Sequence, residues 1–161
     1  MGSALAPVNI LTVDDPAEIL VNTTAWEDIE FEVALDSGSV VHVCAPADIP
    51  GYCIGESAGS RRNQEFLMGD GGTIPNLGES GLNLSDGAKD VHSVFQVAAV
   101  TRPLMSVGRI CDQGHSITFD AVMAVVKFAE GPELCRFERH SGGLYVAKLK
   151  LRSPAGFGRR E

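Results

Sequence analysis

The residue of this sequence best suited to chemistry is Asp36, which ends an apolar stretch and opens the run Asp36-Ser37-Gly38-Ser39. A carboxylate fixed in a rigid, poorly hydrated loop can hold a water molecule and act on it as a general base. Ser37 can fix such a loop through its hydroxyl, and the Gly38 amide can donate to the carboxylate at close range. Ser39 offers a further hydroxyl, which we expect to donate to Asp36.

Asp-Ser-Gly is also a common turn tripeptide, so the surrounding sequence has to distinguish a catalytic loop from a plain turn. The run Leu35–Cys44 reads LDSGSVVHVC. About thirty residues later, Asp70–Gly78 reads DGGTIPNLG. Two further segments, Leu104–Val107 and Gly114–Phe119, read LMSV and GHSITF.

These ordered motifs resemble the proteases of copia-type LTR retrotransposons, which are aspartic proteases of the retropepsin type. That family shows Asp-Ser-Gly-Ala/Ser with a histidine three residues further on, and then a hairpin of the form Asp-Gly-x-x-Ile-x-x-x-Gly. A strand into Leu-x-Ser-Val, a short helix and Gly-x-x-apolar-x-Phe follow. The resemblance covers about Ile29 to Phe119, which is about the size of one retropepsin subunit.

The resemblance implies a role for each motif. Asp36 would be the catalytic acid, and a second copy would supply its twin, because the sequence contains one Asp-Ser/Thr-Gly. Leu104-Met105-Ser106 would pack beneath the catalytic loop, with Ser106 where many relatives carry glycine. The flap that closes over the peptide would comprise Met68, Gly69, Asp70, Gly71, Gly72, Thr73 and Ile74.

The activity implied by this resemblance is that of a homodimeric endopeptidase. Two Asp36 carboxylates would share one proton, since both cannot cheaply ionise together. The expected substrate is the element's own polyprotein, bound in an extended conformation, and no metal or other cofactor is expected. The alternative from another class is a non-catalytic, retropepsin-like interaction module from a decayed or domesticated element.

The elements that would position these motifs are short strands. Ile29–Leu35 alternates apolar and mostly polar residues, which predicts a half-buried strand, and Val40–Cys44 follows as a second strand. The helix expected is Leu104–Gln113, closed by Gly114. A hairpin is predicted around the glycines of the flap. Further strand candidates are Val8–Val13, Leu82–Leu84, Val91–Val100, Ile117–Phe119, Ala121–Phe128, Glu133–Phe137 and Leu144–Leu149.

The predicted fold class is all-β: a retropepsin-like β-barrel with a flap hairpin, one short C-terminal helix and an extra C-terminal antiparallel segment. Eighteen glycines and eight prolines in 161 residues favour many turns. We expect a single domain over 8–151, with its core at about 26–119 and the extension at about 120–151. Residues 1–7 and 153–161 are expected to be flexible ends, and Ala45–Asn63 an irregular surface excursion.

Charge is unevenly distributed along the chain. The net charge is −8, yet residues 1–60 hold ten acidic residues and no Lys or Arg, whereas all thirteen Lys and Arg lie in 61–161. Two interpretations of the basic C-terminal stretch stay open: a solvated tail, or a weak contact with nucleic acid or an adjacent acidic surface. No other nucleic-acid contact is expected. The stretch comprises Lys148, Lys150, Arg152, Arg159 and Arg160.

Other kinds of site fit the sequence less well. The glycine-rich 69–81 region lacks the Gly-Lys-Ser/Thr of a P-loop. A hydrolase pairing Ser37 with His42 would lack the nucleophile-elbow context, and His42 is expected to pack in its strand. The four cysteines form no Cys-x-x-Cys pair, so no metal site is expected, although zinc held by cysteines together with histidines is the alternative. These residues are Cys44, Cys53, Cys111 and Cys135, with His42, His115 or His140.

Membrane and targeting signals are not apparent in the sequence. No stretch approaches the roughly 20 apolar residues that cross a bilayer, and Met1–Ala6 lacks the basic start of a signal peptide. The expectation is a soluble intracellular protein without a membrane partner, in the cytoplasm or within retrotransposon particles.

Overall fold

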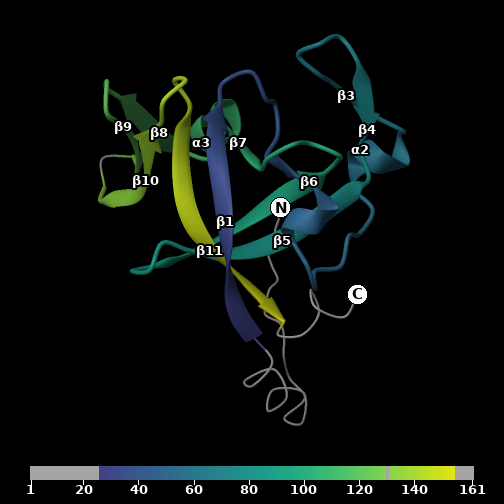
Figure 1. Cartoon of the computed structure of the whole chain (residues 1–161), viewed down its shortest axis with the longest axis horizontal. Helices are drawn as coiled ribbons and strands as arrows, with labels where there is room; N and C mark the ends of the chain where they lie inside the picture. Colours follow the sequence, from purple (N-terminus) through teal and green to yellow (C-terminus); the bar gives the residue numbers. More distant parts are fainter. Residues whose placement is uncertain (1–25, 130, 155–161) are drawn as a thin grey trace.

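A computed structural model describes residues 26–129 and 131–154, which form an all-β protein with a few short helical segments (Figure 1). The strand predicted at Val8–Val13 lies outside the described residues. No helix in the described part of the chain is long and apolar enough to span a bilayer. The elements in chain order are β1 (Trp26–Asp36), β2 (Val43–Cys44), η1 (Pro46–Asp48), α2 (Ala58–Arg61), β3 (Glu65–Leu67), β4 (Thr73–Pro75), β5 (Gly78–Ser85), β6 (Asp90–Val97), β7 (Leu104–Ser106), α3 (Val107–Asp112), β8 (His115–Phe119), β9 (Met123–Phe128), β10 (Glu133–Arg139) and β11 (Tyr145–Pro154).

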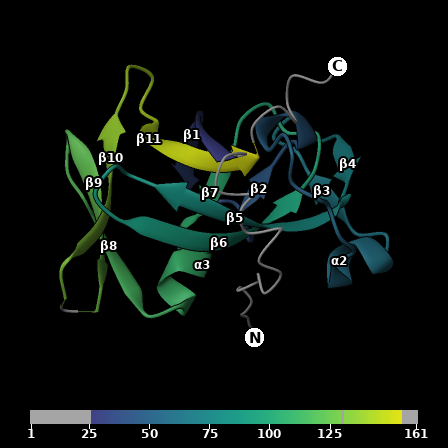
Figure 2. The same cartoon turned by 90° about the horizontal axis from the view of Figure 1, so that it is seen from below.

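Six of the strands form a closed barrel. The order β1-β7-β2-β6-β5-β11 is closed by pairing of β11 back onto β1, and β10, β9 and β8 continue the same sheet outward from β11. Strands β3 and β4 form a separate two-stranded sheet. Figure 2 shows β8–β10 at one side of the barrel and the β3–β4 hairpin at the other.

Alternation along β1 explains how the strand is held. Phe31 and Val33 are buried in the core, whereas Glu30 and Glu32 between and beside them are exposed, which confirms the predicted period of two. Phe31 packs edge-to-face on Phe95 of β6, with ring centroids 5.6 Å apart. The same hydrophobic cluster includes residues of β9 and β10, so the barrel and the outer strands share one core.

Strand β11 is a barrel strand, although 120–151 was expected to extend a core that ends near residue 119. Its pairing with β1 runs antiparallel from Trp26↔Pro154 to Ala34↔Val146. Ser153 and Pro154, expected in a flexible end, are the last residues of β11. The reason is that the long partner strand β1 supplies hydrogen-bonding groups that a tail would lack, and Pro154 is tolerated at the strand end.

The expectation of one short C-terminal helix over Leu104–Gln113 is wrong in its bounds and its number, although the helix precedes the C-terminal strands as predicted. The first three residues of that range form β7, because they pair in parallel with β1, and this tertiary contact overrides their helical propensity. Helix α3 therefore begins at Val107, and four strands follow it. The segment expected to be irregular, 45–63, contains η1 and α2.

The basic C-terminal stretch lies against acidic residues of β1. The β1–β11 register places Lys148, Lys150 and Arg152 directly opposite three acids: Glu32, Glu30 and Asp28. The Nε of Arg152 is 3.4 Å from the Oδ1 of Asp28. The tail interpretation is therefore wrong for these three basic residues, and the adjacent acidic surface is β1 itself. Arg159 and Arg160 lie outside the described residues.

Reversing one charge in the row of opposite-charge pairs between β1 and β11 should lower the stability of the protein measurably. Lys150→Glu places like charges opposite Glu30 and should lower the free energy of unfolding by about 0.2–1 kcal/mol, as measured by urea denaturation at low salt. The exchanged pair, Glu30→Lys with Lys150→Glu, should recover most of this loss, and high salt should reduce the difference. A double variant as unstable as the sum of its two single variants would contradict the pairing.

Candidate active site

Asp36 ends β1 in a tight turn that its own carboxylate closes. The amide of Gly38 donates to Asp36 Oδ1 at 2.8 Å, as the sequence predicted. The amide of Ser39 donates to the Asp36 carbonyl at 3.4 Å. A Cβ at position 38 would lie 3.3 Å from Asp36 Oδ1, so glycine permits this close approach. Asp36 as a residue is half-buried, and its bond to the Gly38 amide is exposed to solvent.

The two serines of the loop differ in their contacts. Ser37 is exposed, and no hydrogen bond joins its hydroxyl to another described residue. The Ser39 hydroxyl donates to the Val41 carbonyl at 2.6 Å, so the expected donation to Asp36 is wrong. A serine hydroxyl readily satisfies a backbone group two residues away. Ser39 therefore fixes the loop from within rather than by contacting the carboxylate.

Strand β7 supports the loop from beneath through a parallel register. Leu35 lies opposite Met105, and Asp36 lies opposite Ser106. The fully buried Ser106 hydroxyl donates to the Ser39 carbonyl at 2.6 Å and accepts from the Arg109 amide at 3.1 Å. Ser106 thus fastens the loop and caps α3 with one hydroxyl. The segment 104–106 thus supports the Asp36 turn through its pairing with β1 and the bond from Ser106 to Ser39.

His42 provides a second tie between the loop and β7. Its Nδ1 accepts from the Ser106 amide at 3.0 Å, and its ring packs on Phe95 with centroids 5.3 Å apart. Burial, aided by the positive charge of Arg109, lowers the pKa of His42 from 6.5 to about 4. The ring is therefore neutral near pH 7. His42 is buried as predicted, but it precedes β2, because only Val43–Cys44 of the strand expected over Val40–Cys44 pairs with neighbouring strands.

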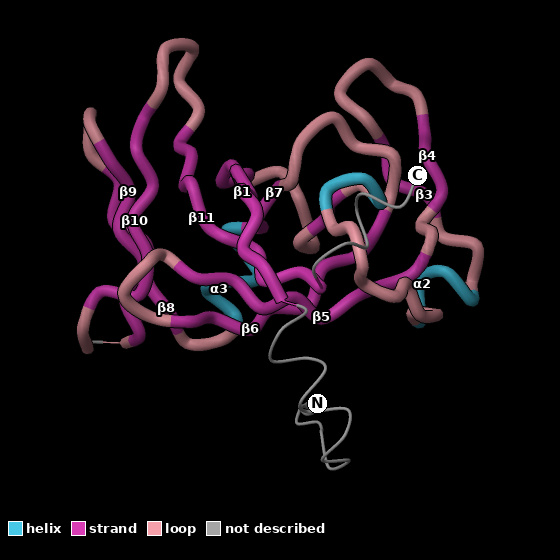
Figure 3. The backbone as a smooth tube through the Cα atoms, turned by 60° about the horizontal axis from the view of Figure 1, so that its bottom comes forward, coloured by secondary structure: helices cyan, strands magenta, loops and turns pink. Residues whose placement is uncertain are grey.

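The predicted flap is the β3–β4 hairpin, with Phe66 opposite Ile74. At its tip the Gly72 amide donates to Asp70 Oδ1 at 2.9 Å, and Gly71 adopts a φ of 92°, a conformation that favours glycine. The hairpin and the loop after β1 project from the same side of the barrel (Figure 3). Asp36 and the flap tip are thus on one side, although no hydrogen bond joins them within the described residues.

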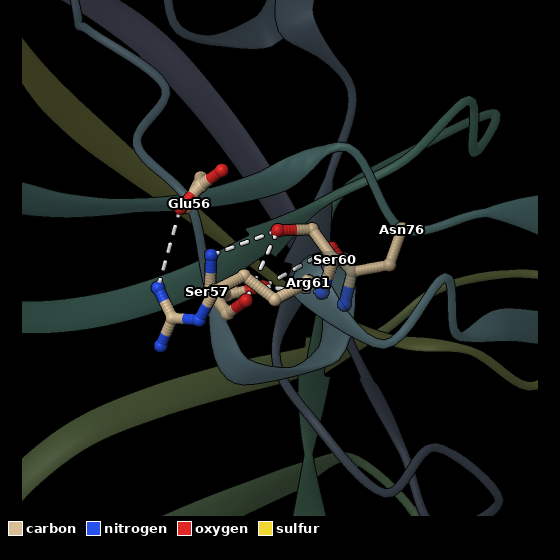
Figure 4. Close-up of polar contacts among 5 residues, drawn as sticks. All are labelled: Glu56, Ser57, Ser60, Arg61 and Asn76. Atoms are coloured by element: carbon tan, nitrogen blue, oxygen red, sulfur yellow. Dashed lines mark hydrogen bonds and ion pairs between the residues drawn. The ribbon is translucent and has the colours of Figure 1, made fainter.

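The sequence did not indicate the residues that hold the base of the predicted flap. Buried Asn76 accepts from the Gly78 amide at 2.8 Å and donates to Gln96 Oε1 at 3.0 Å. Beside it, Ser57 and Ser60 cap the short helix α2 (Figure 4). Asn76 falls at an unspecified position of the family pattern, so no motif indicated it.

The residues that follow Asp36 are largely exposed, among them Ser37, Gly38 and Val40. Four pockets of the described residues lie elsewhere, and one of about 390 Å³ is lined by residues of β1, η1 and the loop 101–103. Within ranges 26–129 and 131–154, no group of three or more His, Cys, Asp or Glu side chains is placed to hold a metal ion. The cysteines in those ranges are free thiols.

Removing the Ser106 hydroxyl should destabilise the protein through two contacts. Ser106→Ala leaves the Ser39 carbonyl without its donor and α3 without its cap, so we expect a loss of about 1–3 kcal/mol in urea denaturation. Ser57→Ala is the control for loss of a helix cap, although it also removes a long, 3.5 Å bond to Asn76. A loss in Ser106→Ala smaller than that in Ser57→Ala would show that the bond to Ser39 contributes nothing.

Known proteins offer no direct guide to this site. No protein-family model, no curated protein and no solved structure matches the chain. The function is therefore inferred from the geometry of Asp36 and from the motifs that surround it.

Proposed function

We propose that this chain is an aspartic endopeptidase of the retropepsin type, in which two copies each contribute Asp36. The observation that carries the proposal is the placement of the Asp36-Ser37-Gly38 turn. The turn ends β1, whose last residue Asp36 lies opposite Ser106 of β7, and the buried Ser106 hydroxyl bonds the Ser39 carbonyl of the loop. The loop lies on the same side of the barrel as the β3–β4 hairpin (Figure 3).

Asp36 differs from the other turn aspartates of the chain. The carboxylates of Asp70, Asp86 and Asp120 also accept from backbone amides two residues on, but each of these residues is exposed at a hairpin tip. The Asp36 turn is tied by β7 and His42, so its carboxylate is held in place. Rigid placement is what general base catalysis requires and what an ordinary surface turn lacks.

A second copy is needed because one chain supplies one such carboxylate. The sequence contains a single Asp-Ser/Thr-Gly, and the loop that carries it is open, with Val40 74% exposed. Two such loops, one from each copy, would face each other, cover the exposed Val40 side chains and bring the two Asp36 carboxylates together. Such a pair shares one proton, since two adjacent negative charges repel.

The chemistry then follows from the shared proton. The ionised carboxylate accepts a proton from water while the hydroxide forms a bond to the peptide carbonyl carbon. The protonated carboxylate donates to the carbonyl oxygen, and collapse of the tetrahedral intermediate with protonation of the nitrogen breaks the C–N bond. Strands β3 and β4 pair only with each other among the described residues. Their outer edges can therefore pair with an extended substrate.

The substrate we propose is the polyprotein of a copia-type element. The same fold with an inert Asp36 would instead be an interaction module, and a variant of this residue separates the two.

Asp36→Asn should abolish peptide cleavage without unfolding the protein. Each mutant dimer would lose both carboxylates, so the rate on a polyprotein fragment should fall by a factor on the order of 10³ or more. Circular dichroism and thermal unfolding should stay close to those of the unaltered protein.

The matched control is Asp86→Asn, which makes the same substitution in an Asx turn at the β5–β6 hairpin. Its cleavage rate should equal that of the unaltered protein. Normal cleavage by a folded Asp36→Asn protein would refute the proposal, whereas absence of cleavage in all three proteins would favour the interaction module.

Dilution should reduce the specific activity, because only the dimer holds two carboxylates. The rate per mole of chain should fall once the concentration drops below the dimer dissociation constant measured by analytical ultracentrifugation. A specific activity that stays constant where sedimentation detects monomer alone would contradict the shared site.

A further inference from the structure

His42 occupies a connecting position between the catalytic loop and the barrel. Its backbone carbonyl accepts from the Gln96 amide of β6 at 2.8 Å, which anchors the residue to the sheet. Its ring reaches to β7, where Nδ1 accepts from the Ser106 amide. The Ser106 hydroxyl in turn donates to the Ser39 carbonyl. A continuous set of hydrogen bonds therefore joins β6, His42, β7 and the loop.

This arrangement requires a neutral ring. A backbone amide is always a donor, so Nδ1 has to accept, and the ring hydrogen has to lie on Nε2. A doubly protonated ring would present a second donor to the Ser106 amide, and the bond would be lost.

The surroundings of the ring also disfavour its protonated form. Phe95 faces it from β6, and Ser106 faces it from β7, and neither is charged. The charged group that acts on the ring is Arg109 of α3, whose positive charge adds to the effect of burial.

We propose that His42 is a positioning residue for Asp36, which holds Ser106 and the catalytic loop in place while its ring is neutral and releases them in acid. This inference rests on the proposed protease function and assigns that site a limit on the acid side. His42 does not contact the reacting atoms; it acts through Ser106.

The direction of the pH effect follows from the difference between the pKa of His42 in the folded chain and in the unfolded chain. The pKa of His42 is about 4 in the folded chain and 6.5 as the ordinary value. Below 6.5 the unfolded chain therefore binds a proton that the folded chain excludes, and stability declines as the pH falls toward 4. The stability that the neutral ring contributes is full above about pH 6.5, and the tie to Ser106 in the folded chain is lost as the pH falls through about 4.

Two substitutions distinguish the role of His42 as a hydrogen-bond acceptor from the effect of protonating its ring. In His42→Asn, the side-chain oxygen can take the place of Nδ1 and accept from Ser106, but it does not titrate in this range. His42→Leu keeps apolar bulk and removes the acceptor. The measurement is kcat and KM on a polyprotein fragment for all three proteins across the acid range.

We expect His42→Leu to lower kcat tenfold or more at every pH with a smaller change in KM, because the loop that carries Asp36 is displaced. His42→Asn should keep kcat within about threefold near neutral pH, and its activity should persist to lower pH than that of the unaltered protein. If the Asn variant loses activity as the Leu variant does, or if its acid limb coincides with that of the unaltered protein, the inference is overturned.

A readout that needs no activity completes the test. In the Asp36→Asn protein, nitrogen NMR of the His42 ring should show the hydrogen on Nε2 and no protonation until about pH 4. A hydrogen on Nδ1, or protonation near 6.5, would overturn the inference even if Asp36 is catalytic. Cleavage by Asp36→Asn would instead refute the proposed function and leave this ring measurement valid, so the two failures are distinguishable. The same readout applies if His42→Leu fails to fold.

Discussion

Three residue pairs join β1 to β7 in parallel. This pairing brings Ser106 to the loop after β1, where its hydroxyl bonds Ser39, 67 residues earlier in the sequence. The pairing places Asp36 opposite Ser106, and the hydroxyl and amide of Ser106 then reach Ser39 and His42. Helix α3 begins at Val107 for the same reason, because Ser106 ends β7 and caps the helix. Without this short ladder, Asp36 would be one more turn aspartate. The geometry of the site thus depends on a non-local contact of three residue pairs.

The parts of the fold that follow from local pattern were predictable. Alternation over 29–35 and the glycines at the tip of the β3–β4 hairpin are signals carried by neighbouring residues, and both elements form as expected. The Asp36 turn was also predictable, since Gly38 closes it locally.

What escaped prediction depends on partners distant in the sequence. Leu104-Met105-Ser106 has no strand signal of its own and becomes a strand because β1 is beside it. Ser153 and Pro154 belong to a strand for the same reason. The hydroxyl of Ser39 had two acceptors within reach, and its sequence position could not decide between Asp36 and Val41. The contacts of Asn76 and Ser57 at the base of the β3–β4 hairpin likewise depend on residues brought together by the fold.

Closure of the barrel by β11 has a consequence for timing during synthesis. Strand β1 carries Asp36 but pairs along most of its length with Tyr145–Pro154, so it leaves the ribosome more than a hundred residues before its main partner. Chain synthesis adds about 5–20 residues per second, and domains fold as the chain emerges. Strand β1 therefore waits several seconds for that partner. During this interval the hydrogen-bonding edge of β1 that β11 will occupy stays unpaired. Under the proposed function, the strand that carries Asp36 would be completed, and cleavage could begin, only after β11 has been synthesised.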